Sequence, residues 1–131
     1  MDLSLERPEG YLYVRRVGAR GVTLIDRELT SSFLLAPDRA IENWPVAAAG
    51  TLDASHVEGL LALQPELVIL GTGERQVFPD AAFMADLLRK GIGIEVMDNA
   101  AAARTYNLLA GEGRRVIAGF ILPPACAAST F

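Results

Sequence analysis

The chain has 131 residues and a formal net charge of −4, a length that suits one folded domain with a buried core. Hydrophobic residues make up 51% and charged residues 21%, which excludes disorder as the overall state. The chain also lacks the basic stripe of a nucleic-acid-binding surface. With one cysteine, Cys126, and one histidine, His56, we expect no internal disulfide, no metal site and no cofactor.

Two further expectations concern the compartment and the domain organisation. No apolar run approaches the ~20 residues that span a bilayer, and residues 1–16 lack the apolar segment of a secretory signal. We therefore expect a cytoplasmic protein without a transmembrane segment. We also expect a single domain over residues 1–131, with its core at about 11–122.

Residues 11–46 are expected to form β-structure. Alternating or β-branched apolar residues fill 11–17 and 21–29, and "GARG" at 18–21 supplies a turn. Two further apolar segments, 31–37 and 39–46, meet at the turn dipeptide Pro37-Asp38.

From residue 51 the apolar period becomes helical and alternates with short apolar runs. Helices are expected within 51–65, 80–91 and 99–111, and central strands of one sheet at 67–70, 94–97 and 116–122. Asp53 or Ser55 would cap the first helix, and Asp98 or Asn99 the third. Gly91 suits a left-handed helix end, and Pro123-Pro124 would terminate the last strand.

This alternation predicts an α/β fold with a mixed central sheet covered by helices. The β-rich first half would supply either an antiparallel part of that sheet or a small added layer.

The sequence "LVILGTGERQVFPD" at 67–80 places two glycines, an arginine and an amide directly after a buried strand. Ligands in open α/β sheets bind outside the carboxyl ends of strands, and glycines allow close approach. Three interpretations remain open: a structural turn, a pocket for an anion or small molecule, and a loop that contacts a protein. The Gly-x-Gly here lacks the third glycine of a dinucleotide fingerprint.

"RTYN" at 104–107 places four residues of mediocre or polar character inside the third helix. A buried polar network that ties the helix to the sheet is the favoured interpretation, and a pocket wall is the alternative. We expect a carboxylate or backbone carbonyls to hold Arg104, because an unpaired buried charge is costly.

Other candidates have plain structural explanations. His56 is expected to be a surface residue near a helix start rather than a base. Helix capping accounts for Asp80 and Asp98 without catalysis. No catalytic residue is assigned.

Three segments, "ENWPV", "LVILGTGERQVFP" and "GIGIEVMDNAAAARTYNLLAGEGRRVIAGFI", resemble the Mth-like domain family of unknown function. This family includes a mitochondrial complex I assembly factor and an adipogenesis-associated protein. The resemblance covers roughly residues 20–122. It implies a three-layer α/β fold with an added antiparallel β-layer at the N-terminal side, and no established enzyme activity.

The family's recurrent residues fall here on Gly71, Thr72, Gly73, Arg75, Gln76, Phe78, Pro79, Asp98, Ala102, Arg104, Thr105, Tyr106, Asn107, Glu112 and Arg114. Many relatives have Ala-Cys where this chain has Ala102-Ala103, so the resemblance implies no thiol chemistry at that position.

The leading functional hypothesis, by family analogy, is a non-catalytic adaptor or assembly-factor-like protein with a protein partner. The alternative is an enzyme or a binder of a small molecule or anion that uses one crevice. The candidate crevice residues are Gly71, Thr72, Gly73, Arg75, Gln76, Asp98, Arg104, Thr105 and Asn107. Whether Phe78 and Tyr106 plug this crevice would discriminate between the two.

Overall fold

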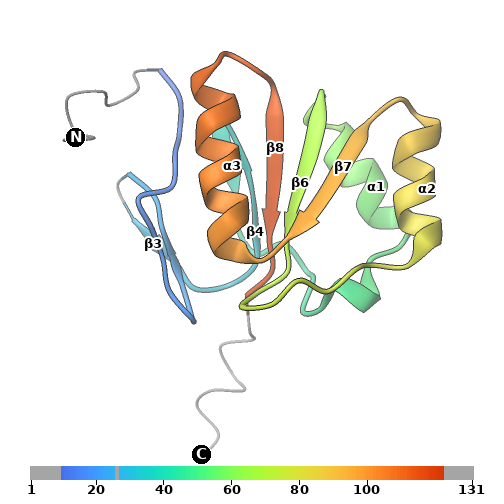
Figure 1. The fold of residues 1–131 in the computed structure, drawn as a ribbon, viewed down its shortest axis with the longest axis horizontal. Coiled ribbons are helices and arrows are strands. Elements are labelled where there is room, and N and C mark those ends of the chain that lie inside the picture. Colours follow the sequence, from blue (N-terminus) through green and yellow to red (C-terminus); the bar gives the residue numbers. More distant parts are fainter. Residues whose placement is uncertain (1–9, 26, 123–131) are drawn as a thin grey trace, which may run out of the picture.

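Two β-sheets, three α-helices and one 3-10 turn make up the part of the chain that the computed structural model describes, residues 10–25 and 27–122 (Figure 1). The predicted stop at Pro123-Pro124 and the lone Cys126 lie outside these residues.

The larger sheet has five strands in the order β5-β4-β8-β6-β7. Their bounds are β4 Phe33–Ala36, β5 Arg39–Ile41, β6 Leu67–Gly71, β7 Gly93–Met97 and β8 Val116–Phe120. β6 runs parallel to β7 and to β8, whereas β4 runs antiparallel to β5 and to β8, so the sheet is mixed as predicted.

The three predicted strands of the second half share this sheet, but the prediction that all are central is wrong for β7. Within the described part of the chain, only β6 pairs with β7, so β7 is an edge strand. An apolar run reports which faces of a strand are covered, and it carries no information on how many strands lie beside it.

The smaller sheet consists of β1 Arg16–Val17, β2 Val22–Thr23 and β3 Glu28–Leu29, all antiparallel. The predicted turn at 18–21 joins β1 to β2. The β-rich first half is therefore divided: β1–β3 form the added layer, and β4 and β5 extend the main sheet.

The helices are α1 Ala54–Leu61, α2 Ala81–Arg89 and α3 Asn99–Gly111, and the 3-10 turn η2 covers Ala49–Thr51. Side chains of α1 and α2 form a core on one face of the five-stranded sheet. Side chains of α3 and of β2 and β3 form a second core on the other face. The result is three layers, with the small sheet beside α3 (Figure 1).

Helix ends follow the sequence closely, with one exception. Asp53 caps α1, and the Asp98 carboxylate accepts a hydrogen bond from the Ala101 N–H at 2.8 Å at the start of α3. Gly91 is left-handed (φ 79°), as predicted for the end of α2. Asp80 precedes α2, but its side chain makes no capping hydrogen bond. The expectation that Asp80 caps this helix with its side chain is therefore wrong.

Candidate functional site

The Gly-Thr-Gly turn begins at a buried glycine because α3 packs directly against it. A Cβ at Gly71 would overlap Asn99 Oδ1 and lie 3.1 Å from Ala102 Cβ. Glycine is therefore required for close packing of helix on strand. Gly73 needs glycine for another reason: its φ of 105° is unfavourable for other residues.

Asn99 holds this junction together from the first residue of α3. Its backbone N–H donates to the Gly73 carbonyl at 2.8 Å, and its side-chain Nδ2 donates to the Ile121 carbonyl at 3.1 Å. The residue is only 4% exposed, and its Oδ1 lies against Gly71 without a hydrogen-bond donor among the described residues. Asn99 was expected as a possible helix cap, and its position two residues after β7 also made it a possible neighbour of the glycine turn; its bond to Ile121 was not expected.

The backbone of the segment that follows, residues 72–78, is held by the side chains of Thr72 and Gln76. Thr72 Oγ1 donates to the Arg75 carbonyl at 2.5 Å and accepts from the Val77 N–H at 2.9 Å. Gln76 Nε2 donates to the Val96 carbonyl of β7 at 2.8 Å. Thr72 and Gln76 thus serve the backbone of the protein itself.

The exposed side chains of residues 72–78 include apolar and cationic ones. Val77 is 49% and Phe78 61% exposed. Arg75 is exposed too, and its guanidinium has no hydrogen-bond or ion-pair partner among residues 10–25 and 27–122. Pro79, buried, anchors the end of the loop at the start of α2.

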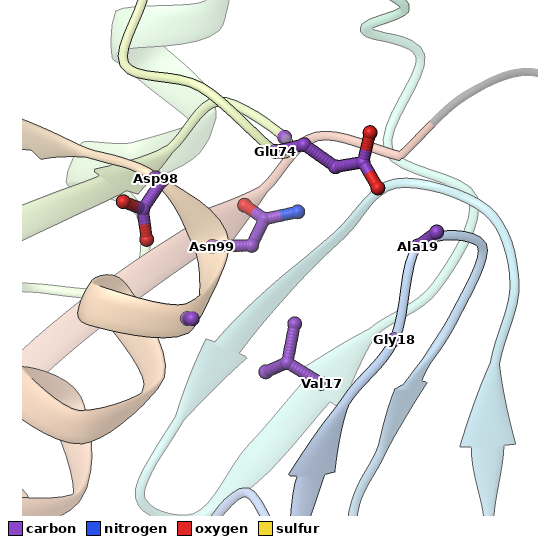
Figure 2. A pocket seen from close by; sticks show the side chains of 8 residues that line it. Val17, Gly18, Ala19, Glu74, Asp98 and Asn99 are labelled. Carbon is purple, nitrogen blue, oxygen red and sulfur yellow. The ribbon is translucent and has the colours of Figure 1, made fainter.

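A cavity of about 240 Å³ lies between the glycine turn, the start of α3 and the turn that joins β1 to β2. Its lining residues are Val17, Gly18, Ala19, Gly73, Glu74, Asp98, Asn99 and Ala100. Figure 2 shows Asp98, Asn99 and Glu74 along one side and the Val17–Ala19 segment along the other. Of the nine predicted crevice residues, only Gly73 and Asp98 line this cavity.

The electrostatics of the cavity are mixed. The start of α3 contributes partial positive charge, but Asp98 already accepts a backbone N–H there. Glu74 adds a second carboxylate, and Arg75 is not among the lining residues. Neither Phe78 nor Tyr106 lines the cavity, so they do not plug it.

The expectation that a carboxylate or backbone carbonyls hold Arg104 is wrong. It is exposed, and no carboxylate or carbonyl holds its guanidinium within the described part of the chain. The reason is the register of α3: the helix buries Ala102, Ala103, Tyr106 and Ala110, which turns Arg104 and Leu108 outward.

The rest of "RTYN" forms contacts that are structural. Asn107 accepts the Val14 N–H at 2.9 Å and donates to the Val14 carbonyl at 2.8 Å. The buried Tyr106 donates to the Leu12 carbonyl at 2.8 Å, and its burial raises the pKa of its phenol. Thr105 Oγ1 contacts Met97 Sδ at 3.5 Å. The favoured network therefore exists, but Asn107 and Tyr106 bind the N-terminal segment rather than the main sheet.

His56 belongs to the capping box of α1. Its Nδ1 accepts the Asp53 N–H at 3.0 Å, and its ring lies edge-on to Trp44 with centroids 6.2 Å apart. Within residues 10–25 and 27–122, no three His, Cys, Asp or Glu side chains gather as metal ligands would. Nor does any described helix combine the length and apolar character needed to cross a membrane.

Comparison with known proteins identifies the family. A family model described as "Protein of unknown function (DUF498/DUF598)" matches residues 14–121. The chain therefore belongs to this family. The solution structure of a Xanthomonas campestris protein is 46% identical, with 93% of this chain and 92% of that one covered and a TM-score of 0.79. A Bordetella pertussis protein described as an Mth938-like domain is 26% identical, with 100% and 99% covered and a TM-score of 0.81.

Other relatives match over only part of their own length. NADH dehydrogenase [ubiquinone] 1 alpha subcomplex assembly factor 3 of Danio rerio is 34% identical over 66% of this chain and 51% of its own length. Its Homo sapiens counterpart is 29% identical over 86% of this chain and 62% of its own length. A "13 kDa major membrane protein" of Francisella tularensis is 35% identical over 50% of this chain and 54% of its own length. The chain thus spans between about half and two thirds of these relatives.

Proposed function

We propose that this member of a family of unknown function is a non-catalytic, assembly-factor-like adaptor that binds a partner protein through residues 72–78, which we call the docking loop. The observation that carries the proposal is the exposure of Val77 and Phe78 on a loop whose backbone is held by the side chains of Thr72 and Gln76. Exposed apolar side chains rimmed by polar residues mark protein contacts.

The way the loop is held supports binding rather than chemistry. Thr72 and Gln76 are engaged with backbone groups, so they are not free to act on a substrate. A rigid loop loses little conformational entropy when it is covered, which favours affinity. Aromatic and arginine side chains are also enriched among residues that dominate binding energy, and Phe78 and Arg75 are of this kind.

The names of the vertebrate relatives support the same class of function, assembly of other proteins. Proteins of this family from vertebrates carry the name of an assembly factor, and assembly requires contact with other proteins. We also propose the cytoplasm as the compartment, which cell fractionation would test.

The test is site-specific photo-cross-linking in native cells. A photoreactive residue in place of Phe78 should capture one dominant partner. The matched control is the same residue in place of Leu108, which is 63% exposed but lies on α3. Phe78→Ser should then weaken capture of that partner, measured with a cross-linker placed at Val77.

Equal capture from positions 78 and 108, or capture that Phe78→Ser leaves unchanged, would show that the docking loop is not the binding surface. Melting temperatures of the variants exclude unfolding as the cause, because Phe78 is exposed and its loss should leave stability within about 0.5 kcal/mol.

A second candidate is a small polar ligand at the cavity beside Gly73, and the observation in its favour is the cavity itself. An anion would use the backbone N–H groups at the start of α3. The carboxylates of Glu74 and Asp98 in the lining oppose an anion, so this candidate ranks second.

A further inference from the structure

The backbone groups along the outer edge of β7 form hydrogen bonds with no other strand of the described residues. Met97 directs its carbonyl toward β6, where it accepts the Thr72 N–H at 3.0 Å. Because successive residues of a strand direct their backbone groups to opposite sides, Val96 and Ile94 direct theirs away from β6. Among the strands of residues 10–25 and 27–122, β7 pairs with β6 alone, so its outer edge has no strand partner there.

The opposite edge of the sheet differs in ways that oppose strand addition. β5 has three residues, and Arg39 and Glu42 place charges in and beside it. Short strands and charged side chains disfavour the pairing of an edge strand with another chain. β7 has five residues, and Glu95 is its only charged side chain. Of the two edges, β7 is therefore the one fit for pairing.

Gln76 occupies one position on this edge. Its side-chain amide donates to the outward-facing Val96 carbonyl at 2.8 Å, as the backbone N–H of an added strand would. Gln76 is exposed, so this bond can be exchanged for one from an incoming chain. The outward groups of Ile94 and the Val96 N–H have no such side-chain cover among the described residues.

We propose that the β7 edge accepts an extended segment of the partner protein as a sixth strand, with a lysine or arginine opposite Glu95. The proposal deepens the adaptor function and rests on it, because Gln76 and the exposed Val77 and Phe78 belong to the same docking loop. Addition of a strand to an open edge is a common mode of peptide recognition.

Charge complementarity selects the occupant. Glu95 is exposed and has no ion-pair partner in the described part of the chain. Opposite charges facing each other across two strands stabilise the pair, whereas like charges destabilise it. Two copies joined symmetrically at the centre of β7 would bring their Glu95 side chains together. A basic segment of another protein fits this edge, and the net charge of −4 favours its approach.

The experiment titrates the full chain with a capped peptide, acetyl-Thr-Val-Lys-Val-Thr-amide, at millimolar concentration. Amide chemical shifts and hydrogen exchange at Ile94 and Val96 report on pairing. The control peptide has glutamate in place of lysine and should bind about threefold more weakly. In Glu95→Lys this preference should reverse, which a structural effect of the substitution would not produce.

A second variant examines the exchange at Gln76. In Gln76→Ala the Val96 carbonyl loses its internal donor, so the lysine peptide should bind more tightly, on the order of fivefold for one net hydrogen bond. Weaker binding would mean that Gln76 does not compete with the added strand.

Three results would overturn the inference. The first is no response of the Ile94 and Val96 amides, and the second is equal binding of both peptides to native chain and to Glu95→Lys. The third is protection of these amides that grows with protein concentration without peptide, which would assign the edge to a second copy. Cross-linking from position 78 tests the adaptor proposal independently of the peptide titration. Capture of a partner there without a response at β7 would refute strand addition and leave the adaptor proposal standing.

Discussion

Replacing Asn107 with alanine should separate the N-terminal segment from α3. The Asn107 amide makes two hydrogen bonds with one residue: it accepts the Val14 N–H at 2.9 Å and donates to the Val14 carbonyl at 2.8 Å. Each is worth about 1 kcal/mol net, so the loss is about 2 kcal/mol. Because Val14 is only 6% exposed, poor access of water to its freed groups would raise the loss towards about 4 kcal/mol.

The measurement is equilibrium unfolding, with amide hydrogen exchange at Val14 as the local probe. A loss of 2 kcal/mol corresponds to a melting temperature roughly 6–10 °C lower for a chain of this size, and exchange at Val14 should accelerate. The control is Leu108→Ala on the same helix, which should change stability by less than about 0.5 kcal/mol. If Asn107→Ala is as stable as the control, or exchange at Val14 is unchanged, the reasoning is refuted.

Three more predictions follow from the site. Gly71→Ala should destabilise the fold by about 1–3 kcal/mol in thermal unfolding, because the new Cβ meets α3. The control is Gly59→Ala, which should not destabilise the fold, because no atom lies within 4 Å of its new Cβ. Arg104→Met should leave the free energy of unfolding within about 0.5 kcal/mol, since its guanidinium is solvated; a larger loss would reveal a structural partner. Phosphate at millimolar concentration should shift amides of residues 71–76 if the turn binds anions, and Arg75→Ala should abolish the shift; silent amides exclude this.

The element types of the second half follow from the sequence because each carries its own local pattern. The run Leu67–Gly71 is uniformly apolar, and the stripe that includes Phe83 and Leu87 has helical spacing. The edge position of β7 could not be predicted, because strand order depends on which segments pair across the fold. The division of the first half into two sheets was open for the same reason.

At the candidate site, the sequence identified which residues are unusual but not which way they point. Arg104 was expected to be held and is exposed, because one helix register buries the alanines and Tyr106 instead. Asn99 was underestimated, since its role depends on Ile121, a residue 22 positions away. Such contacts are fixed by tertiary packing, which a local motif does not encode.

The polar residues of the two motifs share one property that narrows the choice of function. Thr72, Gln76, Asn99 and Asn107 each spend their side-chain hydrogen bonds on backbone groups. A polar group held in this way offers little to a small molecule that cannot replace the hydrogen bond it breaks. Among the other side chains of the two motifs, Arg75, Val77, Phe78 and Arg104 are exposed. These exposed side chains can be covered by another protein. The internal polar network thus accounts for the motifs, and the exposed side chains it displays account for the proposed partner.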